Sequence, residues 1–256
     1  MEKFLYFGRF LFAIAMAAFG TEYCIHALSI SAQTPGPPWV PGHRLVAVFF
    51  AIVLIAAAVC IVTNVKGRAA ATLLGFLILV CALVLDLPKL IEHPRNPNPW
   101  TSGFELLALC GAAWVLAGAA ASDQNQRRHN PLAAIIMPGR ILFAFSLIVF
   151  GVQHFMYAHF VATIITPWIP GHLFWAYFTG ACFIAVAVSI LANQFAPLAT
   201  AMLGLMFLLW VLVLHLPRVL AALHNANEWT SLFVALAMSG GSFVLAGTFA
   251  QRRYRS

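Results

Sequence analysis

Long apolar segments alternate with short polar connections along the whole chain. Each segment is continuous in Leu, Ala, Phe and Val, without the alternation of polar and apolar residues that marks a membrane β-strand. A helix needs about 20 apolar residues to cross the hydrocarbon core of a bilayer. Eight segments are of about this length: 8–26, 44–62, 69–87, 101–121, 140–159, 173–191, 197–215 and 230–249. The pattern predicts an all-α, polytopic membrane protein with eight transmembrane helices.

Composition and charge agree with this class. Hydrophobic residues make up 62% of the chain, charged residues make up 8%, and the mean hydropathy is +0.92. Most of the 14 Lys and Arg residues fall on the side of the predicted membrane that holds both termini, which predicts cytoplasmic termini. The net charge of +7 then reflects topology and contact with anionic lipid. No basic, solvated segment is long enough to bind nucleic acid, so lipid is the expected partner.

The second half of the chain repeats landmarks of the first half in the same order. GRFLFAIAMAAFG at 8–20 matches GRILFAFSLIVFG at 139–151. PWVPGH at 38–43 matches PWIPGH at 167–172, at nearly the same separation along the chain. Two further pairs keep the separation of the PWxPGH pair: DLPK with HLPR, and NPWTSG with NEWTSL. Four landmarks in one order indicate a tandem duplication.

The duplication divides the chain into two predicted four-helix bundles. The first occupies residues 1–121 and the second residues 139–256, joined by a cytoplasmic linker at 122–138. An even number of helices in each half gives both copies the same orientation. The pseudo-twofold axis is therefore expected to run along the membrane normal.

The repeated PWxPGH loop joins the first and second helices of each half. Its prolines fix φ and disfavour helix in the preceding residue, so the loop is expected to form a stiff, non-helical corner. The indoles of Trp39 and Trp168 are of the kind that anchors at a membrane interface. His43 and His172 directly precede a helix and can either cap it or bind a ligand.

Part of the second half resembles a known family. FGVQHF at 150–155 and FVATIITPWIPGHLFWAYFTG at 160–180 resemble the first two helices of DoxX-like (DoxX/DoxD) membrane proteins. Their pattern is a Gly-x-x-His/Lys-Phe element, a proline-flanked aromatic loop and a Tyr-x-x-Gly helix. The first half departs from this pattern at Tyr23, Val48 and Ala51. The family's acidic residue after the last glycine is absent from this chain.

The resemblance implies a four-helix bundle in each copy and a place in the inner (plasma) membrane of a bacterium. Some DoxX-like proteins are subunits of a thiosulfate:quinone oxidoreductase, and others belong to redox or maturation systems. The resemblance therefore implies a membrane subunit associated with electron transfer, with redox-complex subunits as partners. It also implies a quinone-like or other small apolar ligand, and an accessory role if the protein takes part in catalysis.

Polar side chains inside the apolar segments are the candidate functional groups, because such groups are costly in a membrane. Glu22 lies on the helix that begins near Arg9, about 20 Å from the inner surface, and His26 follows one turn later on the same face. The other candidates lie at comparable depth, in the outer third of the membrane: Asp86, Glu105, Gln153, His154 and His215. The first copy carries the carboxylates and the second carries additional imidazoles. We therefore expect an outward-facing polar cavity where the copies meet, in which Glu22, His26 and Asp86 face His154 and His215.

Several functions are compatible with such a set. Histidine and carboxylate can exchange protons with a bound quinone, ligate a metal, or carry protons in a small-molecule permease. A noncatalytic scaffold is a further alternative. The pattern argues against a metal site, because HExxH is absent. The five cysteines form no CxxC, which argues against a thiol–disulfide relay.

Structural explanations of the same residues stay open. Asp86 and His215 each precede Leu-Pro and can simply end a helix at the water boundary. Glu105 can lie in the first turns of a helix, where the helix dipole favours a carboxylate.

Overall fold

The computed structural model describes residues 2–29, 43–119 and 134–253, and the regular structure in these ranges is entirely helical. Eight helical stretches in them are long and apolar enough to cross a membrane, which confirms the predicted fold class. The elements, in chain order, are α1 (Glu2–Ser29), α2 (His43–Thr63), α3 (Gly67–Cys81), η1 (Ala82–Asp86), α4 (Leu87–Glu92), α5 (Pro97–Ala119), α7 (Ile136–Met156), α8 (Ala158–Ile164), α9 (His172–Ala192), α10 (Ala196–Trp210), η3 (Val211–His215), α11 (Leu216–Ala221) and α12 (Ala226–Arg253).

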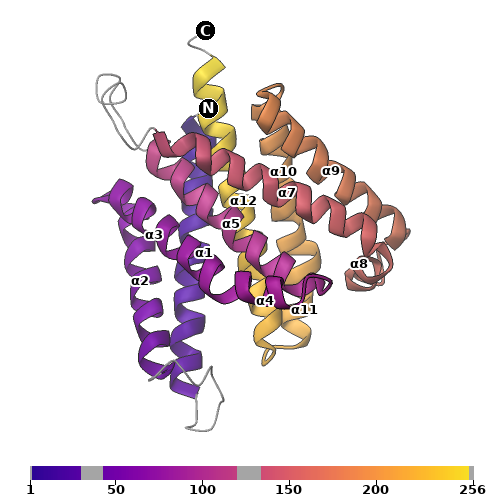
Figure 1. Ribbon diagram of the computed structural model, residues 1–256, viewed down its shortest axis with the longest axis horizontal. Helices are drawn as coiled ribbons and strands as arrows, with labels where there is room; N and C mark the ends of the chain where they lie inside the picture. The colour runs from indigo at the N-terminus through magenta and orange to yellow at the C-terminus, as the bar shows by residue number, and fades with distance from the viewer. Residues whose placement is uncertain (1, 30–42, 120–133, 254–256) are drawn as a thin grey trace.

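The long helices pack in a closed ring. Each contacts the next in the order α1, α2, α3, α5, α7, α9, α10, α12, and α12 contacts α1 again. Helices α5 and α12 also contact each other across the middle of the ring (Figure 1). The first helix of each half therefore packs against the last helix of the other half. The two halves therefore meet at both of their ends, and the division into two four-helix units stays a prediction.

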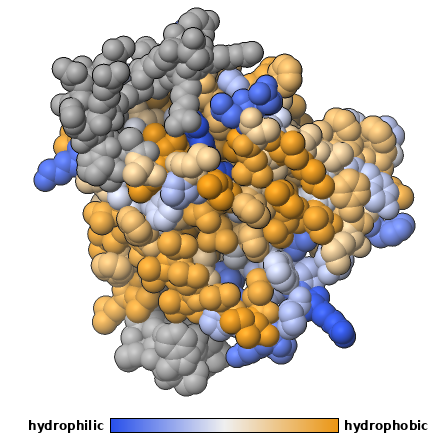
Figure 2. Space-filling model, turned by 45° about the horizontal axis from the view of Figure 1, so that its top comes forward, coloured by the Kyte–Doolittle hydropathy of each residue, from blue (hydrophilic) through white to orange (hydrophobic). Residues whose placement is uncertain are grey.

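The two central helices are the most buried part of the molecule. In α5 and α12, 72% and 83% of the most apolar window is buried, against 33–44% in the other six spans. Those six present large apolar side chains outward, and Figure 2 shows broad hydrophobic surface with hydrophilic residues mostly near its edges. Such a surface suits lipid as the surrounding solvent. The architecture is that of a multi-pass membrane protein.

Glycines allow the helices of the two halves to approach closely. A Cβ on Gly111 of α5 would lie 2.4 Å from the carbonyl oxygen of Gly139 on α7. A Cβ on Gly8 of α1 would lie 2.6 Å from the carbonyl oxygen of Gly240 on α12. In the aligned halves, Gly139 corresponds to Gly8, and Gly240 corresponds to Gly111. The two crossings are therefore equivalent under the sequence repeat, and both are built on small residues, as is common in membranes.

The third helix of each half contains a π-helical turn. The turns, η1 and η3, directly precede Leu-Pro in each copy. Proline has no N–H, and its ring clashes with the carbonyl four residues earlier, so a wider turn lets the helix pass it. Asp86 and His215 each close such a turn, and the helix continues to Glu92 and Ala221. The expectation that these two residues end a helix is wrong.

Other boundaries lie close to those expected from the sequence. Helix α7 begins at Ile136, within the predicted linker, and ends at Met156, where the short α8 takes over. The loop at 165–171 is non-helical, as the prolines predict, and Trp175 donates from Nε1 to the Pro170 carbonyl oxygen at 3.1 Å. Linker residues 120–133 lie outside the described residues. The limits of the two repeats stay a prediction.

Candidate functional site

Polar side chains gather near the first turns of the two central helices. The group around α5, here called the α5 cluster, consists of Asp86, Thr101, Ser102, Glu105 and Gln153. The group around α12, the α12 cluster, consists of Glu22, His215, Arg218, Glu228 and Thr230. The two clusters occupy equivalent places in the repeat, at the same end of the molecule.

Asp86 is the buried carboxylate of the α5 cluster. Its side chain is only 7% exposed, and the Ser102 hydroxyl on α5 donates to its Oδ1 at 2.7 Å. The π-helical turn η1 presents Asp86 to α5, where a Cβ on Gly103 would lie 3.3 Å from the Asp86 Cβ. A carboxylate is thus held beside the central helix within a span of high hydropathy.

Glu105 lies one turn further along α5 than Ser102, on the same face of the helix. It is half-buried, and it makes no hydrogen bond or ion pair with any residue that the structure describes. Asp86 is close enough for its charge to act on the Glu105 carboxyl group. Glu105 lies more than two turns from the start of α5 at Pro97, so the helix dipole does not account for it. Two carboxyl groups therefore share one apolar region.

Gln153 ties α7 to the first turn of α5. The Thr101 hydroxyl donates to Gln153 Oε1 at 3.2 Å, and Gln153 Nε2 donates to the Pro97 carbonyl oxygen at 3.1 Å. Both hydrogen-bonding groups of the amide are satisfied by α5. Gln153 therefore connects one half of the chain to the other.

Glu22 makes the equivalent contact in the α12 cluster. Thr230 of α12 donates from its hydroxyl to Glu22 Oε1 on α1 at 2.8 Å. In the aligned halves, Gln153 corresponds to Glu22, and Thr230 corresponds to Thr101. Glu22 and Gln153 thus accept equivalent hydrogen bonds at the two contacts between the halves. Glu22 accepts a hydrogen bond from Thr230, and the expected meeting of Glu22 with His154 and His215 stays a prediction.

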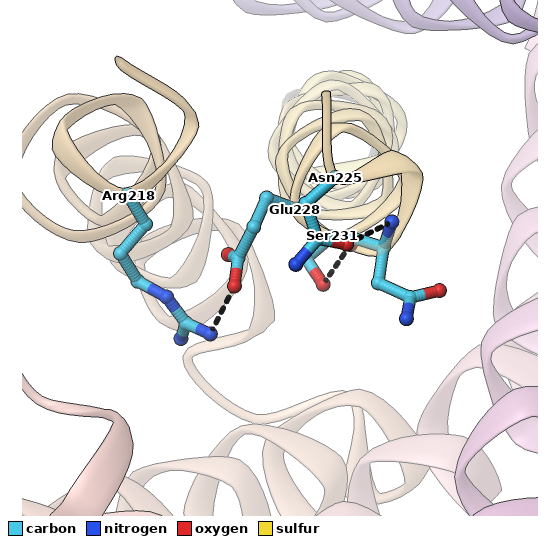
Figure 3. Close-up of polar contacts among 5 residues, drawn as sticks. Arg218, Asn225, Glu228 and Ser231 are labelled. Carbon is cyan, nitrogen blue, oxygen red and sulfur yellow. Dashed lines mark hydrogen bonds and ion pairs between the residues drawn. The ribbon is translucent and has the colours of Figure 1, made fainter. Parts of the chain in front are cut away.

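The α12 cluster contains an ion pair without a counterpart in the α5 cluster. Arg218 reaches from α11 to Glu228 on α12, with Nη2 2.8 Å from Oε1 (Figure 3). The equivalent positions in the first half hold Lys89 and Pro99, which cannot pair. Residues 220–225, in the turn beside this ion pair, line an open depression. The α12 cluster balances much of its charge internally, and the described α5 cluster contains no cation.

The two predicted histidines of the second half occupy different surroundings. His215 is half-buried, and its shielded Nδ1 has no hydrogen-bond partner among the described residues. His154 contacts the carbonyl oxygen of Phe150, one turn back, through Nδ1 at 2.8 Å. Its ring meets Phe183 edge-on, and a Cβ on Gly180 would lie 2.9 Å from its Cβ. His154 therefore belongs to the packed contact between α7 and α9.

The loop residues lie apart from both clusters. Trp168 is 68% exposed, as an interfacial anchor would be. His172 is the first residue of α9, and Gly171 occupies the capping position before it, so His172 does not cap the helix. Trp39 and the side chains of His26 and His43 lie outside the described residues. Within the described ranges, no three His, Cys, Asp or Glu side chains are placed to hold a metal ion.

Hydroxyl residues that bind the predicted carboxylate and amide groups were not among the candidates from the sequence. Thr101 and Ser102 recur as Thr230 and Ser231 in the Trp-Thr-Ser triplet of each half. The repetition of this triplet at the start of a predicted span in each half is the sequence feature that could have identified these hydroxyl residues.

Comparison with known proteins identified no relative of this chain. No family model, curated protein or solved structure matches the chain. The fold and the placement of its polar clusters define a multi-pass helical membrane protein. The resemblance to DoxX-like proteins stays a prediction.

Proposed function

We propose that the protein is a DoxX-like membrane subunit associated with electron transfer. Its α5 cluster would bind a quinone-like or other small apolar molecule that exchanges protons. The observation that supports this most is the pair of carboxyl groups, Asp86 and Glu105, beside the central helix. Carboxylates this far inside an apolar span are costly to keep, so a functional role is the default interpretation.

The two carboxyl groups differ in what they can offer a ligand. Asp86 Oδ1 is occupied by Ser102, so Asp86 is held in position for a ligand at its second oxygen. Glu105 makes no hydrogen bond or ion pair with the described residues and is available as a proton acceptor. When a bound quinone is reduced, its electrons would come from a partner redox subunit and its protons would pass through these carboxyl groups. When a hydroquinone is oxidised, both transfers run in reverse. The partner is required because the sequence shows no redox motif of its own.

A binding assay tests the proposed site. In protein reconstituted in nanodiscs, a short-chain quinone titrated against tryptophan fluorescence is expected to bind saturably. Asp86→Asn and Glu105→Gln are each expected to weaken binding about tenfold, the usual scale for losing a charge-assisted hydrogen bond. Glu92→Gln, at an exposed position on α4, is the matched control and should leave the affinity unchanged.

The outcomes of this assay separate the candidate functions. Quinone affinity that is equal in the wild type, Asp86→Asn and Glu105→Gln would refute the proposed site.

A proton-coupled permease is supported by a different observation, the Glu22–Thr230 contact between the halves. Proteoliposome uptake that collapses in Glu22→Gln would favour that function. Folded protein with neither activity would favour the noncatalytic scaffold.

We also propose that the protein lies in a bacterial inner membrane with both termini in the cytoplasm. The start of α1 and the end of α12 lie together at one end of the molecule, as does the turn between α2 and α3 (Figure 1). Lys66 and Arg68 belong to this turn and the first turn of α3, and Arg9 contacts the Val62 carbonyl oxygen at the end of α2. Positive charge favours the cytoplasmic side. A green fluorescent protein fused to the C-terminus is expected to fluoresce, whereas a fused alkaline phosphatase is expected to be inactive. The opposite pair of results would invert the topology.

A further inference from the structure

Three basic side chains surround the turn between α2 and α3, at the end of the molecule opposite the two polar clusters. Arg9 projects from α1, Lys66 lies in the turn, and Arg68 lies in the first turn of α3. All five acidic side chains that the structure describes lie at the other end: Glu22, Asp86, Glu92, Glu105 and Glu228. The basic group therefore has no described carboxylate to neutralise it.

Arg9 is held in place but few of its donors are used. Its guanidinium lies 5.0 Å from the ring centre of Tyr6 and 5.7 Å from that of Phe10. Among described residues its hydrogen bonding is a single long contact, 3.5 Å from Nη2 to the Val62 carbonyl oxygen at the end of α2. Its Nε is shielded from solvent and has no partner there. Arg9 thus presents a positioned cation with donors to spare.

The turn itself brings Lys66 and Arg68 to the same place. Asn64 and Lys66 adopt the left-handed conformation, with φ of 61° and 53°, so α3 folds back directly over the end of α2. Gly67 permits this, because a Cβ there would lie 3.0 Å from the Cys60 carbonyl oxygen. Lys66 is exposed at the tip of the turn. Arg68 is half-buried, and its Nε is shielded and without a partner in the described residues.

The second half shows that the turn does not need this charge to form. Asn193 and Phe195, at the equivalent positions, have φ of 56° and 53°. Phe195 stands in place of Lys66, and Pro197 stands in place of Arg68. The same backbone geometry therefore carries basic side chains in one copy and none in the other. Lys66 and Arg68 are therefore available for binding, and only the first half has them, whereas Arg9 corresponds to Arg140 of the second half.

We propose that Arg9, Lys66 and Arg68 bind the phosphate group of an anionic phospholipid. Arginine and lysine are the usual phosphate ligands, and the first turn of α3 adds backbone N–H groups of favourable polarity. Exposed apolar side chains adjoin the basic group, among them Phe10 at 42% and Val65 at 65% exposure. These would contact the glycerol and acyl portions, which favours a lipid over a free anion. The site is separate from the α5 cluster and does not depend on its ligand.

Lipid titration monitored by native mass spectrometry tests this site. Delipidated protein in detergent is expected to bind phosphatidylglycerol in preference to phosphatidylcholine. Lys66→Ala and Arg68→Ala are each expected to weaken phosphatidylglycerol binding about fivefold, the scale for one basic residue near an anionic surface. Lys89→Ala removes an exposed charge at the other end of the molecule and should have no effect.

A further variant, Lys66→Phe, introduces the residue type that Phe195 provides at the equivalent position of the second half. This variant still tests the proposal if Arg68→Ala fails to fold. Thermal unfolding confirms that each variant is folded. Equal binding of the two lipids, or unchanged phosphatidylglycerol binding in Lys66→Phe, would overturn the proposal. Inorganic phosphate that binds in the millimolar range, and displaces the lipid equally well, would show a site for free anions instead.

Discussion

Gly111→Ala is expected to lower the free energy of unfolding by at least about 2–3 kcal/mol, the upper range for overpacking a tight interface. A Cβ at this position would lie 2.4 Å from the carbonyl oxygen of Gly139 and 3.1 Å from the backbone nitrogen of Phe143. Backbone atoms cannot rotate away as a side chain can, so α5 and α7 must separate along their whole contact. Unfolding in detergent, followed by circular dichroism, measures the loss.

Two companion variants make this result specific. Gly240→Ala changes the equivalent crossing, where a Cβ would lie 2.4 Å from the backbone nitrogen of Phe12, and should cost about as much. Ala56→Val adds volume to an exposed position on α2 and is expected to be nearly neutral. A Gly111→Ala protein as stable as the wild type would show that the central helices do not approach this closely.

Trp114→Ala is expected to destabilise the protein by about 3 kcal/mol, near the lower end for truncating a buried tryptophan. Trp114 is 8% exposed, its ring meets Phe76 at 5.0 Å between centroids, and it fills the space above Gly75 of α3. Lipid is as apolar as the protein interior, so the loss comes chiefly from van der Waals contacts and the cavity that remains. The same unfolding assay gives the value.

Trp168→Ala provides the matched control for that truncation. Trp168 is 68% exposed in the loop before α9, so its removal leaves no internal cavity. We expect a change within about 0.5 kcal/mol, as for ordinary surface positions. Equal losses in the two tryptophan variants would contradict the assigned packing of Trp114.

The sequence predicts the spans well because the bilayer sets their length. About 20 apolar residues are needed for a crossing whatever the neighbouring helices are, so the pattern alone locates all eight spans. Which helices become neighbours is a different matter. The contact of Gly8 with Gly240 depends on how two distant helices cross, and hydropathy carries no information about that. The hydropathy pattern therefore did not predict how the helices close into a ring.

The candidate site shows the same division between local and distant information. Asp86 and Glu105 stand out because ionisable groups are rare in apolar segments, and the structure brings them to one region of α3 and α5. The sequence did not single out Thr230 as a partner of Glu22, because it does not tell which helices cross. In the ring, α1 lies on α12, so the Thr230 hydroxyl donates to Glu22.

Hydrophobic periodicity does not predict the two π-helical turns. A proline after Asp86 or His215 signals a disturbed helix, but the sequence does not tell whether the helix stops or widens. The distinction matters for function, because the widened turn keeps Asp86 within the span and directs it toward Ser102.

The contacts between the end helices of the two halves also bear on how such a chain could have arisen. A polypeptide with only one α1-to-α5 unit would leave the faces of its first and last helices uncovered. A second identical chain could cover both, with the first helix of each chain lying on the last helix of the other. If the predicted duplication took place, the ancestor is expected to have been a symmetric dimer whose two subunits became one molecule on fusion. Once joined, each half was free to change alone, as the unequal charges of the two clusters indicate.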